Sequence, residues 1–239
     1  MADSTLAESV ERHSWYHTHD FGHGVVTKGM FDHRHVVDKY MIPADLSGKR
    51  CLDVGTMDGF WAFEMERRGA AEVKAADVSG DPDELDWPPR WRAQVTTELD
   101  EGKEIRFELA RSAFDSKVER VQRSVYDLDT DLGQFDLIFC GDLLIHLKDP
   151  ITALQRIHRV CRGSAIICNP IKRFRLARGP MVEFDGISEF QWWLLSEGAM
   201  ERMMRAVGFD RVEVGRSFEL PATGPGKWKG LRGIVRGSV

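Results

Sequence analysis

The sequence lacks the features that tie a chain to a membrane or to an oxidising compartment. No apolar run approaches the length of a membrane-spanning helix, and the N-terminus has neither the basic region nor the apolar stretch of a signal peptide. Cysteine is scarce, and the four present have no metal-ligand spacing and form no disulfide framework. These absences predict a cytoplasmic protein whose cysteines are buried, reduced thiols.

An excess of positive charge is also missing. Lysine and arginine number 33 against 38 aspartates and glutamates, a net charge of -5, and there is no basic tail. Because phosphate neutralisation needs clustered cations, a nucleic-acid partner is not expected. The one local basic cluster consists of Lys172, Arg173, Arg175 and Arg178. The 239 residues, 42% of them apolar, fit one globular domain with an appendage and leave a homodimer open.

A strand–turn–helix pattern over residues 50–61 organises the rest of the chain. Residues 51–54 predict a buried strand, the next five a glycine-bearing turn, and Phe60 begins a helix. Such a turn presents free backbone N–H groups and a helix N-terminus to a ligand. The spacing Gly55-x-x-x-Gly59 differs from the Gly-x-Gly-x-x-Gly of dinucleotide-binding turns.

Two acidic residues belong to this pattern. Asp53 lies two residues before the first glycine, and Asp77 ends the next apolar run, residues 73–77. At that separation, the second strand of a βαβ unit delivers a carboxylate to ribose hydroxyls. Asp58 is positioned to cap the helix that follows the turn. The residues alone allow either a methyl-donor site or an ordinary nucleotide-type βα turn.

Asp53 in the run Leu-Asp-Val-Gly-Thr-Met-Asp-Gly, followed by Asp77, resembles the class I S-adenosylmethionine-dependent methyltransferases. Met57 departs from that family's first motif, which has a third small residue there. The resemblance covers roughly residues 48–236. It implies S-adenosyl-L-methionine as cofactor, a binding domain over 48–239 and an N-terminal helical or lid segment over 1–47.

The alternation of strands and helices predicts an α/β fold with a mainly parallel, doubly wound sheet. The resemblance implies seven strands, the last of them antiparallel. Expected strands span 51–54, 73–77, 118–125, 135–140, 164–168, 209–214 and 231–235, and expected helices span 4–12, 31–41, 59–68 and 104–114, with two more beginning at Asp149 and Ser196.

Ligands in such sheets lie beyond the carboxyl ends of the strands. By resemblance, Tyr126 or Asp127 flanks the adenine, while Trp87 and Trp91 either stack on it or anchor a surface loop. The predicted cofactor-binding residues are Asp53, Gly55, Thr56, Asp58, Gly59, Trp61, Asp77, Val78, Tyr126, Asp127, Cys140 and Gly141.

The stretch 15–24 mixes aromatic rings, imidazoles and glycine without a helical or strand period, which is typical of a functional lid. His17, His19, Asp20 and His23 resemble a metal cluster in composition. No cysteine or distant carboxylate completes the set, so no metal site is predicted. The imidazoles are expected to cover a bound acceptor instead.

Residues 135–150, in which His146 precedes Lys148-Asp149-Pro150, resemble methyltransferases that modify hydroxyl groups and also the tRNA wobble-uridine carboxymethyltransferases. Residues 15–32 resemble actinobacterial small-molecule and sugar O-methyltransferases. His146 is the predicted general base, with His17 and His19 as competitors. The expected activity is O-methylation of a small polar acceptor, such as a sugar. The alternatives are a tRNA-modifying enzyme and a non-catalytic S-adenosylmethionine-binding module.

Overall fold

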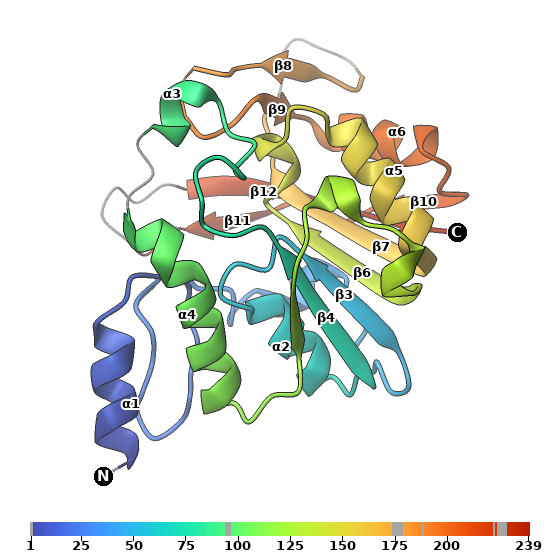
Figure 1. Cartoon of the computed structure of the whole chain (residues 1–239). Helices are drawn as coiled ribbons and strands as arrows, with labels where there is room; N and C mark the ends of the chain where they lie inside the picture. Colours follow the sequence, from blue (N-terminus) through green and yellow to red (C-terminus); the bar gives the residue numbers. More distant parts are fainter. Residues whose placement is uncertain (1, 94–96, 174–178, 188, 222, 224–228) are drawn as a thin grey trace.

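A computed structural model of the chain describes residues 2–93, 97–173, 179–187, 189–221, 223 and 229–239. Its body is an eight-stranded sheet (Figure 1), in which seven strands follow the order β10-β12-β7-β6-β3-β4-β5 and β11 also pairs with β12. The strands are β3 (Arg50–Val54), β4 (Glu72–Asp77), β5 (Glu119–Gln122), β6 (Phe135–Gly141), β7 (Cys161–Pro170), β10 (Arg211–Val214), β11 (Phe218–Pro221) and β12 (Lys229–Ser238).

The five consecutive strands from β7 to the edge strand β5 are parallel, and β12 runs antiparallel to β7. The predicted α/β fold, including the antiparallel last strand, is therefore confirmed. The sequence did not predict β11, and the third predicted strand, residues 118–125, is shorter in the structure. Its last residue, Val125, belongs instead to the 3-10 helix η2 (Val125–Asp127).

Helices cover both faces of the sheet, because the central strands bury apolar side chains on both sides. On one face, α2 (Phe60–Arg67) and α4 (Thr97–Ala113) contribute Phe63 and Phe107 to a cluster that contains Ile166 of β7. On the other face, α5 (Pro150–Val160) and α6 (Glu197–Ala206) pack on Ile167, the next residue of the same strand. Successive side chains of β7 thus point to opposite faces of the sheet, and each face has its own hydrophobic cluster.

Three side chains, Asp58, Asp149 and Ser196, were expected at helix N-termini, and two of them are confirmed as caps. Asp149 accepts a hydrogen bond from the backbone N–H of Thr152 at 2.9 Å, and Ser196 caps α6 in the same way. The predicted Asp58 cap is wrong. Gly59 is the N-cap of α2 and no side chain caps it, because the Asp58 carboxylate is bound by a distant segment described below.

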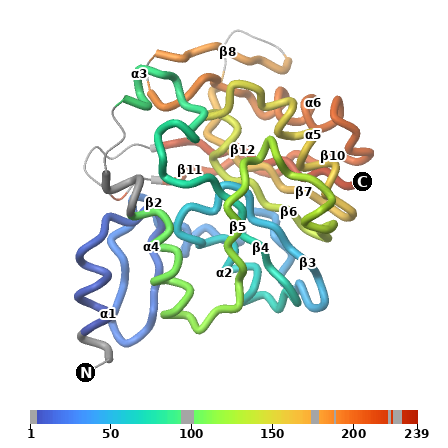
Figure 2. Tube along the Cα trace, viewed as in Figure 1, coloured from blue at the N-terminus to red at the C-terminus, as the bar shows by residue number. Residues whose placement is uncertain are grey.

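The N-terminal part packs on the same core. Helix α1 (Ala2–Glu11) lies on the same side of the molecule as α4 (Figure 2), and the first cluster contains Val10 and Trp15. Strand β1 (Trp15–His17) pairs in parallel with β2 (Gly29–Phe31). A Cβ at Gly29 would lie 2.2 Å from a backbone carbon of His17, so this close pairing requires glycine.

The helix predicted over 31–41 is wrong. Only the single 3-10 turn η1 (Val37–Tyr40) forms there. The carboxylate of Asp32 accepts the backbone N–H of Arg34 at 3.1 Å, a local turn that competes with helical hydrogen bonding.

Short elements gather at one end of the molecule, where α3 (Pro89–Arg92) lies near the hairpin of β8 (Val182–Phe184) and β9 (Trp193–Leu195) (Figure 1). The Trp91 indole donates to the carbonyl of Ile187 at 3.0 Å, so Trp91 anchors this region. The 3-10 turns η3 (Thr130–Leu132) and η4 (Leu144–His146) flank β6. Among the helices that the structure describes, none combines the length and apolarity needed to cross a membrane.

Candidate functional site

A cavity of about 1120 Å³ lies at the carboxyl ends of β3 and β6. These neighbouring strands form the switch point of the sheet, because the chain continues from β3 to β4 on one side and reaches β6 on the other. The predicted site residues that line the cavity are Asp53, Gly55, Trp61, Asp77, Val78, Tyr126, Gly141, His17 and His146.

Six other predicted site residues are not among the lining residues: Thr56, Asp58, Gly59, Asp127, Cys140 and His19. Cys140 is fully buried in the second hydrophobic cluster, and the Thr56 hydroxyl donates to Asp53. His19 is 2% exposed and stacks on Phe21, outside the lining. The structure therefore supplies no support for direct ligand contact by these side chains.

Asp77 joins the turn after β3 to helix α4. Its carboxylate accepts the backbone N–H of Met57 at 2.8 Å and that of Val78 at 2.9 Å. It also forms a buried ion pair with Lys103 of α4, with Nζ 2.5 Å from Oδ1. Lys103 could not be predicted as a site residue, because its partner lies 26 residues away in the sequence. A carboxylate has about four acceptor positions, so Asp77 retains capacity for a hydroxylated ligand.

Asp53 is 1% exposed and lies at the base of the turn, where it accepts the Thr56 hydroxyl at 2.6 Å. Burial raises the pKa of Asp53 to about 7, and the hydrogen bond from Thr56 offsets only part of that effect. The cavity therefore holds a carboxyl group that changes protonation near neutral pH.

We expect Asp53→Asn to change how stability depends on pH. Because the folded pKa lies above the unfolded value, the stability that Asp53 contributes is lost as pH rises from about 4 through 7, by up to about 4 kcal/mol. The neutral amide does not ionise, so the variant should gain stability relative to wild type between pH 4 and 8. Urea unfolding at pH 4 and pH 8, without added ligand, measures the difference in the free energy of unfolding between variant and wild type. Parallel curves of that free energy against pH would contradict the raised pKa of Asp53.

His146 lines the cavity from η4, just after β6. Its Nδ1 is in hydrogen-bond contact with the carbonyl oxygen of Phe190. Since a carbonyl only accepts, Nδ1 carries the proton and Nε2 carries the lone pair of the neutral ring. Burial lowers the pKa of His146, which favours that neutral form. The arrangement provides a proton acceptor beside the cavity.

An aromatic wall supports His146. The rings of Trp87 and Phe190 lie 4.7 Å apart, and Trp87 is 5.9 Å from the imidazole. Asp86 holds the wall in place, because its Oδ2 accepts the Tyr126 hydroxyl at 2.7 Å and the backbone N–H of Lys148 at 2.7 Å. Of the two tryptophans considered for adenine stacking, Trp87 lines the cavity.

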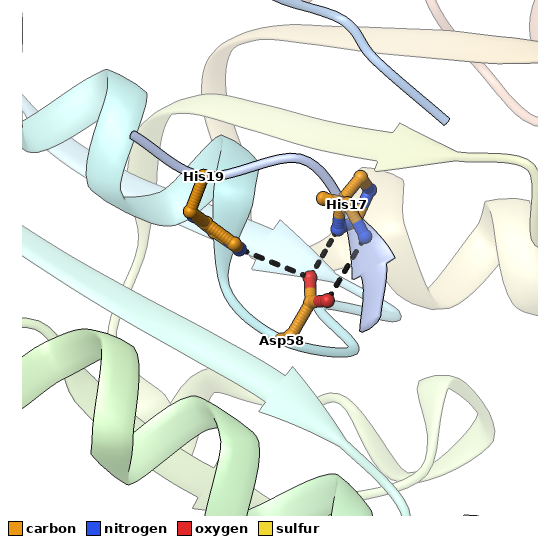
Figure 3. Close-up of side chains that lie close together, drawn as sticks. All are labelled: His17, His19 and Asp58. Atoms are coloured by element: carbon orange, nitrogen blue, oxygen red, sulfur yellow. Dashed lines mark hydrogen bonds and ion pairs between the residues drawn. The ribbon is translucent and has the colours of Figure 1, made fainter. Parts of the chain in front are cut away.

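Asp58 binds the N-terminal segment to the turn after β3. Its Oδ2 accepts the backbone N–H groups of Tyr16 and His17, each at 2.9 Å. Its Oδ1 contacts His17 Nδ1 and lies 3.4 Å from His19 Nε2, so the carboxylate sits between the two imidazoles (Figure 3). Burial opposes ionisation, but the imidazoles outweigh it and hold the pKa of Asp58 far below its usual value. We call these three side chains the lid clasp.

The lid clasp corrects one argument made from the sequence. A distant carboxylate does join His17 and His19, whereas Asp20 and His23 do not belong to the group. The potential ligand atoms lie within 4.8 Å of one another. A divalent cation held by two neutral imidazoles and one carboxylate would leave a net charge of +1 in this buried aromatic surrounding. We therefore interpret the group as a clasp in which the Asp58 carboxylate is hydrogen-bonded to His17 and lies 3.4 Å from His19.

Two further lining residues form an ion pair and were not among the predicted site residues. Arg232 of β12 is 1% exposed and forms an ion pair with Asp142, with Nη2 2.8 Å from Oδ2. Asp142 follows β6 directly and could have been noted as a carboxylate at a strand end. Arg232 gave no such signal, because it lies within an apolar strand and reaches the cavity only through the antiparallel pairing of β12 with β7.

Comparison with known proteins agrees with this architecture. A family model described as a methyltransferase domain matches residues 33–214. The chain is 27% identical over 177 residues to the ubiquinone biosynthesis O-methyltransferase of Neisseria meningitidis serogroup C (strain 053442), covering 70% of this chain and 66% of that protein. It is 25% identical over 171 residues to the tRNA U34 carboxymethyltransferase of Ectopseudomonas mendocina (strain ymp), covering 70% and 47%. The chain thus spans about half to two thirds of these relatives.

Among solved structures, the N-terminal domain of EvdMO1, crystallised in the presence of SAH and D-fucose, superposes with a TM-score of 0.67. The alignment covers 100% of this chain and 97% of that domain, with 16% sequence identity. At this identity the likeness establishes a shared fold, and it includes the N-terminal segment as well as the sheet.

Proposed function

The chain belongs to the methyltransferase domain family, and we propose that it transfers a methyl group from S-adenosyl-L-methionine to a hydroxyl of a small neutral acceptor, a sugar or a similar polyol. The observation that supports O-methylation best is His146, whose neutral ring keeps a lone pair at the cavity. An aliphatic hydroxyl is a weak nucleophile at neutral pH and gains from a base that accepts its proton.

The cofactor end of the cavity fits an adenosyl group. Gly55 adopts a left-handed φ of 77° and lines the cavity without a side chain, which leaves room beside the turn. Asp77 would accept a ribose hydroxyl in its remaining acceptor position, and Tyr126 and Val78 would flank the adenine. When bound, the cofactor supplies an electrophilic methyl group on its sulfonium. The chain's residues position the acceptor, hold the ring of His146 and accept the hydroxyl proton.

Methyl transfer to a panel of acceptors tests this function directly. Radiolabelled S-adenosyl-L-methionine is incubated with the protein and neutral sugars, phenols or tRNA, and we expect label in the neutral polyol fraction. Label in tRNA alone would favour the RNA-modifying alternative. That alternative rests on the likeness to tRNA U34 carboxymethyltransferases and on the basic cluster. Within the cluster, Lys172 forms an ion pair with Glu183 and Arg173 donates a hydrogen bond to Ser217, while Arg175 and Arg178 lie outside the described residues. Binding of the donor without transfer to any acceptor would favour a non-catalytic module.

Asp77→Asn should weaken binding of S-adenosylhomocysteine at least tenfold, because hydrogen bonds to a charged acceptor contribute about 1.5–3 kcal/mol each. The substitution also breaks the ion pair with Lys103, so Lys103→Met is the matched control. The Lys103→Met control removes the ion pair and keeps the Asp77 carboxylate. Its affinity for S-adenosylhomocysteine should stay within a few-fold of the wild-type affinity. Titration calorimetry measures both, and equal affinities for Asp77→Asn and wild type would remove Asp77 from the cofactor site.

A further inference from the structure

One polar group in the cavity has no part in the chemistry described above. Asp142 and Arg232 form a buried ion pair, with contacts of 3.0 Å from Nε and 2.8 Å from Nη2 to a single carboxylate oxygen, Oδ2. Tyr16 lines the same cavity from β1, and its phenol is electrostatically coupled to Asp142 and Arg232. These residues come from three separate elements and meet next to Gly141, at the carboxyl end of β6.

Stability alone does not account for this group. Removing two charges from water is costly, and an apolar pair of similar volume often gives an equally stable protein. Asp142 also adopts a left-handed φ of 51°, which aspartate tolerates better than most residues other than glycine and which orients its carboxylate after β6. A buried ion pair at a cavity wall is typical of residues that are held in position for a ligand.

The unused hydrogen-bonding capacity defines the ligand. Within the described residues, no hydrogen bond reaches Oδ1 of Asp142 or the hydroxyl of Tyr16. Burial raises the pKa of Tyr16, with Asp142 adding to the effect, so the phenol stays protonated and able to donate. The cavity wall therefore presents one carboxylate acceptor and one hydroxyl that donates and accepts, and it has no net charge because Asp142 neutralises Arg232.

An apolar surface borders these polar atoms. The rings of Tyr16 and Phe31 lie 5.2 Å apart, and the Arg232 guanidinium lies 5.4 Å from the centre of the Phe31 ring. A flat aromatic face beside a carboxylate and a hydroxyl suits a ring that carries C–H groups on its face and hydroxyls at its edge.

We propose that Asp142, Tyr16 and the neutralised Arg232 form a specificity subsite that binds two adjacent hydroxyls of an uncharged cyclic acceptor. This inference rests on the proposed function, because it identifies the acceptor class of the same cavity. An anionic acceptor is excluded by Asp142, since Oδ1 would repel it while Arg232 is already paired.

The experiment uses three small probes on the full chain saturated with S-adenosylhomocysteine. They are cis-1,2-cyclohexanediol, cyclohexanol and cyclohexanecarboxylate, with binding followed by ligand-observed NMR titration. We expect the diol to bind wild type at least fivefold more tightly than cyclohexanol and cyclohexanecarboxylate. Equal binding of the three, or a preference of wild type for the carboxylate, would overturn the subsite.

Two variants sharpen the test. Asp142→Asn leaves Arg232 without its counter-ion, so the preference of the protein for the diol over the carboxylate should reverse. Compared with wild type, the variant should bind cis-1,2-cyclohexanediol at least fivefold more weakly and cyclohexanecarboxylate at least tenfold more tightly. Tyr16→Phe should weaken the diol several-fold without improving the carboxylate, and it leaves the ion pair in place. If both variants keep the wild-type preference for the diol over the carboxylate, the proposal is refuted.

Affinity for S-adenosylhomocysteine in each sample reports whether the variant is folded and whether the cofactor site works. If that ligand does not bind wild type, the proposed function fails, whereas normal binding with no diol preference overturns only the subsite.

Discussion

Replacing His146 by glutamine should lower turnover by about two to four orders of magnitude, which is the range supplied by a positioned general base. Glutamine is polar and close in size but cannot accept the hydroxyl proton. Affinity for S-adenosylhomocysteine should change little, because the imidazole acts on the acceptor. Turnover numbers of His146→Gln and His146→Ala, with the exposed His35→Gln as the matched control, measure the effect.

The pH profile provides a second measurement on the same residue. Burial lowers the pKa of His146 from its ordinary value near 6.5, and the neutral ring is the active form. Activity should therefore rise with pH below about 6.5 and change little above it, and the rise should vanish in His146→Gln. If glutamine retains most of the activity while alanine does not, the residue only orients the acceptor and the base assignment is wrong.

The fold could be predicted from the sequence because its signals are local. The strand–turn–helix at 50–61 and the caps Asp149 and Ser196 each depend on a few neighbouring residues. The errors occurred where local patterns compete with partners far away. The helix expected over 31–41 overlaps the last residue of β2, which pairs with β1, and only the 3-10 turn η1 forms in the rest of that range; Asp58 left its capping position to bind the N-terminal segment.

In the candidate site, too, residues with a local signal could be predicted and residues with distant partners could not. Residues at strand ends, such as Asp53, Asp77 and His146, could be placed because parallel strands deliver their carboxyl ends to one edge of the sheet. Lys103 and Arg232 could not, since each reaches the cavity through tertiary pairing that the sequence does not encode locally.

The lid clasp supports the second large effect that we expect. Asp58→Ala should lower the free energy of unfolding by about 3–5 kcal/mol, because it removes the charged partner of a buried cluster and leaves two backbone N–H groups without acceptors. Asp58→Asn keeps an oxygen for those groups and should cost less, about 1.5–3 kcal/mol, through the lost charge. Thermal and urea unfolding, with the exposed Asp38→Asn as control, measure both variants.

The pH dependence of the free energy of unfolding distinguishes a charged clasp from simple apolar packing. The folded pKa of Asp58 lies below its unfolded value, so its contribution is present above about pH 4 and is lost as pH falls further. Asp58→Asn lacks that contribution, and the gap between variant and wild type should therefore narrow in acid. A gap that stays constant between pH 3 and 7 would show that the charge of Asp58 is not what holds the segment.

The clasp should also control methyl transfer, because it holds in place the strand that carries Tyr16 and His17 to the cavity. In Asp58→Asn, amides of residues 14–24 should exchange hydrogen faster, and turnover should fall by more than affinity for S-adenosylhomocysteine. Chelator treatment of wild type provides the opposing test. If removal of a bound metal lowered stability as much as Asp58→Asn does, the three side chains would be metal ligands. For a clasp without a metal, we expect the chelator to leave unfolding unchanged.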